Sequence, residues 1–298
     1  MKYLVFLIMI ASCLLVAGPS VAYVLQAENL AKDRGDFIRI INECGRQLII
    51  IDHSFDGGRK SLWSPQELSA MKSSDSKRKI LAYLSIGEAE DYRFYWKKEW
   101  KSKRPAFLLS ENREWRGNFH VRYWDEEWQK IVTAYLVKII QQGFDGVYLD
   151  IVDGYEFFEK GKDNCLNPMT KRSYRDDMKA FVLGIVRKAK RQSSGFMVFQ
   201  QNAQALFEDG DYLSQLDGIG AEDVFTDGRR RQKEGDFKEA IQYLKKAQTK
   251  GLQVFLIEYP ADKQLRHFIR SNAAKYGLAT LVTDRELTTL GEFFAPAH

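Results

Sequence analysis

The chain has 298 residues, which allows two ordinary domains or one large α/β barrel, and its 45% of hydrophobic residues leaves ample material for a core. It carries 45 Lys and Arg residues against 40 Asp and Glu residues, a formal net charge of +5. No basic run is interleaved with aromatic residues, and the basic cluster at 229–233 is typical of a solvated loop, so we expect no nucleic-acid partner.

The first 22 residues have the pattern of an export signal. Lys2 supplies a positive start, residues 3–17 are apolar, and small residues ending at Ala22 offer a cleavage site. We therefore predict a signal peptide over 1–22 and a secreted, periplasmic or cell-envelope protein. An uncleaved anchor or a lipidated Cys13 is the alternative, and either would be the only attachment to a membrane.

Short apolar runs and amphipathic segments alternate along the rest of the chain. The helix signal is clearest from Trp128, where apolar residues at steps of three and one draw a single stripe that ends at Gly143. Such a stripe indicates an outer helix lying on a sheet. Strands are predicted, in chain order, at 47–51, 79–86, 119–124, 147–150, 197–200, 217–220, 253–257 and 278–282. Helices are predicted at 36–42, from Ser64 onward, and at 128–140, 174–186, 236–251 and 265–269.

Eight strands that alternate with helices, about thirty residues apart, fit one (β/α)₈ TIM barrel better than two domains. No linker interrupts the pattern, so we assign residues 23–298 to a single barrel domain. The residues that follow the strands then share one mouth, where the catalytic groups of such barrels gather. Acidic residues are frequent at these positions: Glu88, Glu90, Asp91, Asp150, Asp153, Glu222, Asp223 and Glu258.

The stretch 143–155, GFDGVYLDIVDGY, contains the most informative of these acids. Val147, Tyr148 and Leu149 predict a buried strand that ends in Asp150. An ionised carboxylate at that point is costly to desolvate, so it persists only when it is solvated, paired or used in chemistry. The alternative is an Asp that caps the next loop.

Paired carboxylates in a cleft rimmed by aromatic residues suit hydrolysis of glycosidic bonds. One acid protonates the leaving oxygen while the other attacks the anomeric carbon or activates water. The four His residues lack zinc-ligand spacing, although an all-oxygen calcium or magnesium site stays an alternative. Neither a Gly-x-Ser-x-Gly elbow nor a Walker or Rossmann fingerprint is present. We expect no cofactor and no metal.

Five stretches in order carry a family resemblance: Tyr83 to Tyr92 (YLSIGEAEDY), Gly143 to Asp150 (GFDGVYLD), Gln201-Asn202, Asp217 to Asp223 (DGIGAED) and Glu258-Tyr259. On these residues the sequence resembles glycoside hydrolase family 114, the endo-α-1,4-polygalactosaminidases. The similarity covers Leu48 to about Asp284. It implies a (β/α)₈ barrel that acts on α-1,4-linked galactosamine polymers.

By this resemblance, Asp150 matches the family's catalytic Asp, the expected nucleophile, and Glu222 matches its catalytic Glu, the expected general acid/base. The barrel prediction agrees independently, because the strands before these residues would be the fourth and the sixth. Inward residues of even-numbered strands belong to the same layers. We favour a retaining mechanism, which needs the carboxyls about 5 to 5.5 Å apart, over an inverting one.

Other residues of the mouth are candidates for substrate binding. Two of them have structural alternatives: Glu88 in a buried pair with an Arg, and Asp52 as a hydrogen-bonded residue at a strand end. An acidic mouth would attract a cationic amino-sugar polymer, although glycosidase clefts are generally acidic. The tryptophans at 96, 100, 115, 124 and 128 are expected to be packing residues. The candidates are Asp52, Tyr83, Glu88, Asp91, Tyr92, Asp153, Asn202, Asp223, Glu258 and Tyr259.

The leading hypothesis is a monomeric endo-glycosidase that acts on an amino-sugar polysaccharide. A catalytically inactive barrel that binds polysaccharide is the alternative. Some proteins of this broad group have carried a label related to aminoacyl-tRNA synthetases, but the chain lacks the HIGH and KMSKS signatures. The loop from Gly154 to Arg172 is longer than the family leads us to expect, and we expect it to border the site and influence which polymer is bound.

Overall fold

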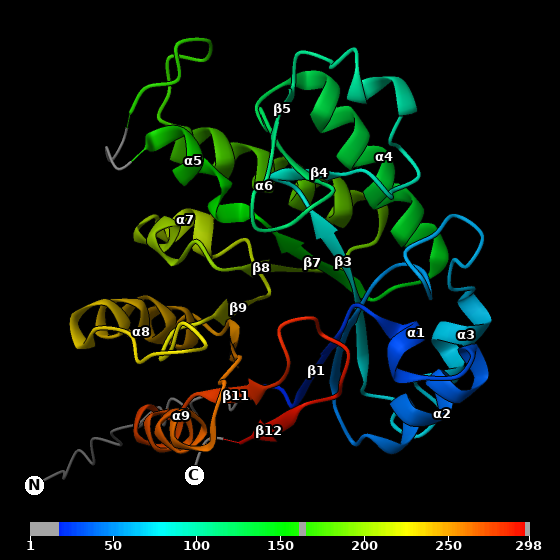
Figure 1. Cartoon of the computed structure of the whole chain (residues 1–298), viewed down its shortest axis with the longest axis vertical. Coiled ribbons are helices and arrows are strands. Elements are labelled where there is room, and N and C mark those ends of the chain that lie inside the picture. The colour runs from blue at the N-terminus through cyan, green and yellow to red at the C-terminus, as the bar shows by residue number, and fades with distance from the viewer. Residues whose placement is uncertain (1–17, 161–164, 296–298) are drawn as a thin grey trace, which may run out of the picture.

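Nine strands form one sheet that curls into a nearly closed barrel (Figure 1). The computed structural model describes residues 18–160 and 165–295. The ring is joined where the backbone N–H of Leu25, just after β1, donates to the carbonyl oxygen of Leu287 at 3.1 Å. The first eight strands are parallel, which confirms the predicted barrel, and β12 is antiparallel to β11. In spatial order the strands are β1 (Val21–Val24), β2 (Leu48–Ile51), β3 (Lys79–Ser85), β7 (Gly146–Asp150), β8 (Met197–Gln201), β9 (Gly218–Glu222), β10 (Gln253–Glu258), β11 (Ala279–Val282) and β12 (Glu292–Phe294).

Helices cover the outside of the strands (Figure 1). In α4, the carboxylate of Asp125 accepts the N–H of Glu127 at 2.8 Å, and Gly143 ends the helix in the left-handed region at φ 92°. The predicted apolar stripe of this helix is buried. The helices are α1 (Ala27–Leu30), α2 (Arg34–Glu43), α3 (Pro65–Ala70), α4 (Glu126–Gln142), α5 (Glu156–Glu159), α6 (Tyr174–Gln192), α7 (Gly210–Leu213), α8 (Glu234–Thr249) and α9 (Lys263–Tyr276). Three short 3₁₀ turns are Lys98–Lys101, Val152–Tyr155 and Gln204–Glu208.

Side chains along each barrel strand alternate between two cores, as the strand geometry requires. One set packs against the helices, for example Ile49, Ala82 and Val147. The other set fills the interior of the barrel, so the barrel is a packed core and not a pore. The interior is formed mainly by Val21, Tyr23, Leu48, Ile50, Leu81, Tyr83, Tyr148, Phe199, Phe255, Ile257, Ala279 and Leu281.

One predicted barrel strand, at 119–124, was wrong. The strand there, β6 (Asn118–Val121), pairs antiparallel with β4 (Glu88–Glu90) and β5 (Leu108–Glu111) in a separate sheet. A short β-prone run predicts that a strand forms but not which sheet it joins. The first strand of the ring is instead β1, so β7 and β9 are still fourth and sixth.

The predicted signal peptide overlaps the first residues of β1. Residues 1–17 of the predicted signal peptide lie outside the described residues. Val21 and Ala22 are fully buried and pair with β2, so the predicted boundary after Ala22 falls inside a strand. No helix in the described ranges is both long and apolar enough to cross a bilayer.

Candidate active site

The alternation of side chains along the strands determines which residues reach the mouth of the barrel. On β7, Tyr148 fills the interior, and Asp150 is the next inward position along the strand. On β9, Gly220 is an inward position and Glu222 follows it by two residues. The two carboxylates therefore enter the same end of the barrel from strands that are separated by β8.

The two glycines of β9 make room for aromatic rings inside the barrel. A Cβ atom at Gly218 would overlap the ring of Phe199, and one at Gly220 would overlap the hydroxyl of Tyr148. Any larger residue at these positions would displace the packed interior. Glu222 is thus the first inward position of β9 that can carry a side chain.

A cavity of about 490 Å³ opens at this mouth, within the usual size range of small-molecule sites. Its wall includes residues that follow most of the barrel strands, together with residues of the three-stranded sheet and its turns. The structure brings together most of the residues that the sequence singled out. The predicted residues that line the cavity are Asp52, Tyr83, Tyr92, Asp150, Asp153, Asn202, Glu222 and Tyr259.

Asp150 is held by two hydrogen bonds. Tyr83 Oη donates to Oδ2 at 2.6 Å, and the backbone N–H of Ile151 donates to Oδ1 at 2.7 Å. Burial raises the pKa of Asp150 to about 6, although both hydrogen bonds act to lower it. At neutral pH this carboxyl group is mostly ionised, as a nucleophile must be.

Glu222 is held by two side-chain donors. Tyr259 Oη donates to Oε1, and Gln201 Nε2 donates to Oε2. Its backbone N–H donates to Oδ1 of Asn202 at 2.8 Å, which fixes the end of the strand. Burial, and then the negative charge of Asp150, raise the pKa of Glu222 to about 8. This carboxyl is mostly protonated at neutral pH, as a general acid must be.

The two carboxyl groups therefore differ in protonation at neutral pH. The surroundings place the pKa of Asp150 near 6 and that of Glu222 near 8. The negative charge of Asp150 contributes to the raised pKa of Glu222. A pair of titratable groups whose environments separate their pKa values is typical of an acid and a nucleophile in one site. The arrangement can protonate a leaving group and attack the same substrate.

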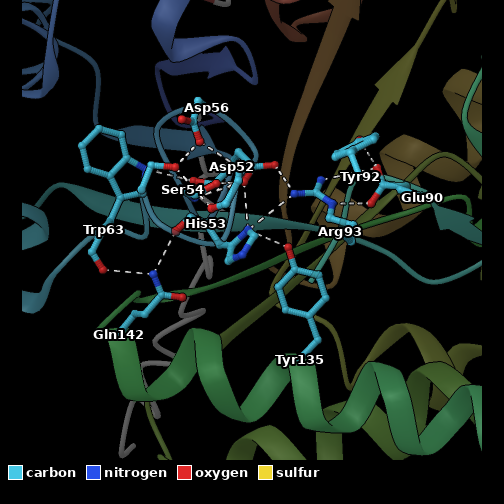
Figure 2. Close-up of polar contacts among 12 residues, drawn as sticks. Asp52, His53, Ser54, Asp56, Trp63, Glu90, Tyr92, Arg93, Tyr135 and Gln142 are labelled. Atoms are coloured by element: carbon cyan, nitrogen blue, oxygen red, sulfur yellow. Dashed lines mark hydrogen bonds and ion pairs between the residues drawn. The ribbon is translucent and has the colours of Figure 1, made fainter. Parts of the chain in front are cut away.

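Asp52 lines the cavity but is tied into a buried ionic network (Figure 2). Arg93 lies between Asp52 and Glu90, donating from Nη1 to Asp52 Oδ2 at 2.5 Å and from Nε to Glu90 Oε2 at 2.6 Å. Burial opposes ionisation of Asp52, yet the guanidinium of Arg93 and the contact with His53 lower its pKa below the ordinary range. Tyr135 Oη also contacts Nδ1 of His53 at 2.6 Å. The geometry matches the predicted alternative, a hydrogen-bonded residue at a strand end.

Four predicted residues do not line the cavity: Glu88, Asp91, Asp223 and Glu258. On β10, the inward positions are Ile257 and Tyr259, so Glu258 points to the opposite side. Its carboxylate accepts the N–H of Phe225 at 2.7 Å and the hydroxyl of Thr226 at 2.9 Å. Burial raises the pKa of Glu258 to about 8. Its observed contacts secure the loop after β9.

The remaining three acids are engaged by other side chains and do not line the cavity themselves. Glu88 accepts a hydrogen bond from Asn112 at 2.8 Å and lies 3.1 Å from Nδ1 of His120, so its partner is not the Arg considered as an alternative. Asp91 pairs with Lys101 at 2.9 Å. The carboxylate of Asp223 is engaged by Arg285, whose side chain does line the cavity. These residues follow strands as predicted, but their side chains turn away from the mouth.

The sequence missed several residues of the cavity wall: Glu90, Arg93, Gln201 and Arg285 were not assigned to the site, and Trp115 was expected to pack. Trp115 instead is 41% exposed on the wall, and Tyr92, also on the wall, is 51% exposed. A signal for Trp115 was available, because it stands in the polar stretch NREWRGN without apolar neighbours to pack against.

The long loop after β7 contributes less to the cavity than expected. Asp153, just before it, lines the cavity, and burial followed by the charge of Asp150 raises its pKa to about 7. None of the described residues of 154–172 is part of the cavity wall. The loop is fastened to α6, because Asp177 accepts hydrogen bonds from Asn167 at 2.7 Å and Thr170 at 2.6 Å.

The acids at the mouth are not arranged as a metal site. Across 18–160 and 165–295, no group of three or more His, Cys, Asp or Glu side chains could hold a metal ion.

Sequence comparison connects the chain to a family and to relatives from distant organisms. The family model for glycoside-hydrolase family GH114 matches residues 56–296. An uncharacterized protein of Methanocaldococcus jannaschii is 37% identical over 262 residues, which covers 83% of this chain and 73% of the relative. An uncharacterized protein of Deinococcus radiodurans is 35% identical over 245 residues, which covers 82% of this chain and 75% of the relative.

Solved structures share the fold at low sequence identity. The glycoside hydrolase domain of PelA from Pseudomonas aeruginosa has a TM-score of 0.65 at 16% identity, covering 92% of this chain and 98% of that domain. Ega3 of Aspergillus fumigatus, solved in complex with galactosamine, has a TM-score of 0.66 at 16% identity, covering 93% of this chain and 96% of that chain. Both similarities support the barrel architecture.

Proposed function

Because the chain belongs to glycoside hydrolase family GH114 and is a glycoside hydrolase, we propose that it cleaves α-1,4-linked galactosamine-containing polysaccharide. Cleavage is internal and retains the anomeric configuration. The observation that carries the proposal is the pair of inward carboxyl groups with separated pKa values, Asp150 near 6 and Glu222 near 8. Most glycoside hydrolases use a pair of carboxyl groups as their catalytic residues.

In the first step, the carboxylate of Asp150 attacks the anomeric carbon while Glu222 gives its proton to the glycosidic oxygen. The bond between that carbon and that oxygen breaks, a covalent ester to Asp150 forms, and the leaving chain departs as an alcohol. In the second step, the Glu222 carboxylate takes a proton from water and the resulting oxygen attacks the same carbon. The ester breaks, Asp150 returns as a carboxylate, and Glu222 is protonated again.

An amino sugar is the substrate class that the charges of the cavity favour. Asp52 and Glu90 are both ion-paired with Arg93, whereas Asp153 lines the wall with no arginine among its described contacts. An ammonium group of the sugar supplies the cation that this carboxylate lacks. The binding of galactosamine by Ega3, a protein of the same fold, supports the same class of substrate.

Internal cleavage of a polymer is supported by the rim of the cavity. Trp115 and Tyr92 expose 41% and 51% of their surface there, and exposed aromatic rings stack on the faces of sugars. Such rings at the rim would bind sugar units of the chain beyond the one that is cleaved. Asn202 and Tyr259 line the same cavity and are proposed partners for substrate hydroxyl or amine groups.

The proposal is tested by incubating the purified protein with galactosaminogalactan and with its deacetylated form. We expect new reducing ends, a rapid fall in polymer length, and faster cleavage of the deacetylated polymer. Proton NMR of the first product should show the α-anomer, as retention requires. A first product in the β-configuration would reject the covalent mechanism, and release of single sugars without shortening of the polymer would reject internal cleavage.

We propose that the protein is exported to the cell surface, the periplasm or the medium. A polysaccharide of this kind would be reached outside the cytoplasm. The apolar segment 1–22 supports this proposal. Fractionation of cells that produce the full chain should recover it outside the cytoplasm. Mass spectrometry of the recovered protein would show whether the chain is cleaved, lipidated at Cys13 or intact.

A further inference from the structure

Arg285 lines the cavity but has no part in the two chemical steps above. It lies in the turn between β11 and β12, beyond the last parallel strand of the barrel. Its guanidinium donates from Nη1 and Nη2 to the two oxygens of Asp223, each at 2.9 Å. The same guanidinium lies over the ring of Tyr259, 4.5 Å from the ring centre. Planar, bidentate contacts of this kind fix both partners.

Both partners of Arg285 adjoin Glu222. Asp223 is the next residue in the chain, and Tyr259 Oη donates to Oε1 of Glu222. We propose that Arg285 is a positioning residue for Glu222, holding the Tyr259 hydroxyl on the carboxyl group and neutralising the charge of Asp223 beside it. This inference rests on the proposed role of Glu222 as the general acid/base.

Hydrogen bonds secure the turn that carries Arg285. The carboxylate of Asp284 accepts the backbone N–H of Thr288 at 3.0 Å and the hydroxyl of Thr289 at 2.9 Å. The carbonyl oxygen of Leu287 accepts the N–H of Leu25, which joins the turn to the end of β1. These contacts anchor the backbone from which the Arg285 side chain extends.

Space for the guanidinium is also built into the opposite loop. A Cβ atom at Gly228 would lie 3.0 Å from Nη2 of Arg285 and 3.0 Å from the carbonyl oxygen of Tyr259. Gly228 has a φ of +85°, a conformation that favours glycine. A side chain at this position would crowd both Arg285 and the carbonyl oxygen of Tyr259.

The charges around Glu222 predict that removal of Arg285 changes the pKa of Glu222. The titratable groups that interact with Glu222 come from several elements: Tyr23 on β1, Tyr148 and Asp150 on β7, Tyr259 after β10, and the adjacent Asp223. Asp150 and Asp223 both act to raise the pKa of Glu222. Arg285 also interacts with Glu222 and carries a positive charge, and its own pKa is raised first by the hydrogen bonds to Asp223. Without Arg285, the full negative charge of Asp223 would act on Glu222.

A comparable arginine lies on the other side of the site. Arg93 is 5.8 Å from the ring centre of Tyr83, which donates to Asp150. The Arg93 side chain is only 1% exposed and bridges two carboxylates, so its removal would leave buried charges and disrupt the fold. The side chain of Arg285 is 42% exposed, so this residue can be replaced in a folded protein.

The test is a charge cycle of three variants: Arg285→Met, Asp223→Asn and the double variant. Loss of the cation raises the pKa of Glu222, so Arg285→Met should move the alkaline limb of the kcat/KM profile up by about half a pH unit or more. Asp223→Asn removes the negative charge that pairs with Arg285, so the positive charge of Arg285 lowers the pKa of Glu222. The alkaline limb should then move to lower pH. The double variant should return it toward the wild-type position. Circular dichroism would confirm that all three variants are folded.

A second readout does not depend on activity. The protein is labelled with ¹³C at the side-chain carboxyl of glutamate, the Glu222 resonance is identified by its absence in Glu222→Gln, and its titration is followed by NMR. The same order of pKa values is expected: Arg285→Met highest, Asp223→Asn lowest. If Arg285→Met lowers activity but moves neither the limb nor the NMR titration, the inference is overturned. Absence of hydrolysis in the wild type would instead reject the proposed function, while the NMR titration would still decide the role of Arg285.

Discussion

The hydroxyl group of Tyr83 donates to Oδ2 of Asp150 at 2.6 Å, from the neighbouring strand of the barrel. This hydrogen bond favours the ionised form of a carboxyl whose burial favours the neutral form. Asp150 can act as a nucleophile at neutral pH because the hydrogen bond limits the effect of burial.

Replacing Tyr83 with Phe should therefore raise the pKa of Asp150 above its value of about 6. Since the nucleophile must be ionised, we expect the acid limb of the kcat/KM profile to move to higher pH, and kcat/KM at pH 7 to fall by about tenfold. Tyr259→Phe is the matched control, because it removes the equivalent donor to Glu222 and should move the alkaline limb instead. An acid limb that stays in place in Tyr83→Phe would show that this hydroxyl does not control the nucleophile.

The exposed ring of Trp115 should matter for long substrates and not for short ones. We expect Trp115→Ala to raise KM for the polymer by about fivefold, the equivalent of one aromatic stacking contact, with little change for a disaccharide. Phe157→Ala is a suitable control, because Phe157 is 37% exposed and does not line the cavity. Equal effects of Trp115→Ala on polymer and disaccharide would argue against a binding role at the rim.

The position of β1 predicts how far the N-terminus can be shortened. Val21 and Ala22 are fully buried, and Val21 pairs with Leu48. A chain that begins at Tyr23 should lose about 2 to 4 kcal/mol in free energy of unfolding relative to a chain that begins at Gly18. Urea denaturation of the two proteins measures this difference. Identical unfolding midpoints would mean that the first half of β1 is dispensable.

Stability should increase as the pH falls from 8 to 5. Five carboxyl groups have pKa values raised to between about 6 and about 8 in the folded protein, so the folded state binds more protons than the unfolded chain in this range. We expect a Tm about 5 °C higher at pH 5 than at pH 8 by differential scanning calorimetry. The groups are Asp150 (about 6), Glu88 and Asp153 (about 7), and Glu222 and Glu258 (about 8).

The behaviour of Asp52 and a variant of Glu258 test whether the raised pKa values cause this change in stability. Asp52 has a lowered pKa and stabilises the fold above its unfolded value of about 3.9, so its contribution is lost only at lower pH. Glu258→Gln removes one of the titrating groups away from the cavity and should narrow the difference in Tm between pH 5 and pH 8. A higher Tm at pH 8 in the wild type would contradict the raised pKa values.

The sequence predicted the residues that follow strands better than the direction of their side chains. Asp150 and Glu222 were placed correctly at the mouth because each ends a strand with a clear apolar pattern. Glu258 also ends a strand, but the inward positions of β10 are Ile257 and Tyr259, and a shift of one residue reverses the face. The register of that strand is set by packing inside the barrel, which a single sequence does not display.

The sequence also did not predict the ion pairs between residues that are far apart in the chain. Arg93 lies next to a recognised stretch, yet its pairing with Asp52 joins residues 41 positions apart, and the pairing of Arg285 with Asp223 spans 62 positions. β1 was not predicted as a barrel strand, because its four apolar residues have no local feature that marks one, and its first two residues fall within the predicted signal segment. Only the closure of the ring shows that this strand is needed.

The central claim, that Asp150 and Glu222 act together on one glycosidic bond, is tested most directly by the rate of reducing-end release from the deacetylated polymer at pH 7. Asp150→Asn and Glu222→Gln should each lower this rate by about a thousandfold or more. Asp91→Asn, a change in an acid that pairs with Lys101 away from the cavity, should keep the wild-type rate. Hydrolysis at the wild-type rate by either Asp150→Asn or Glu222→Gln would contradict the account.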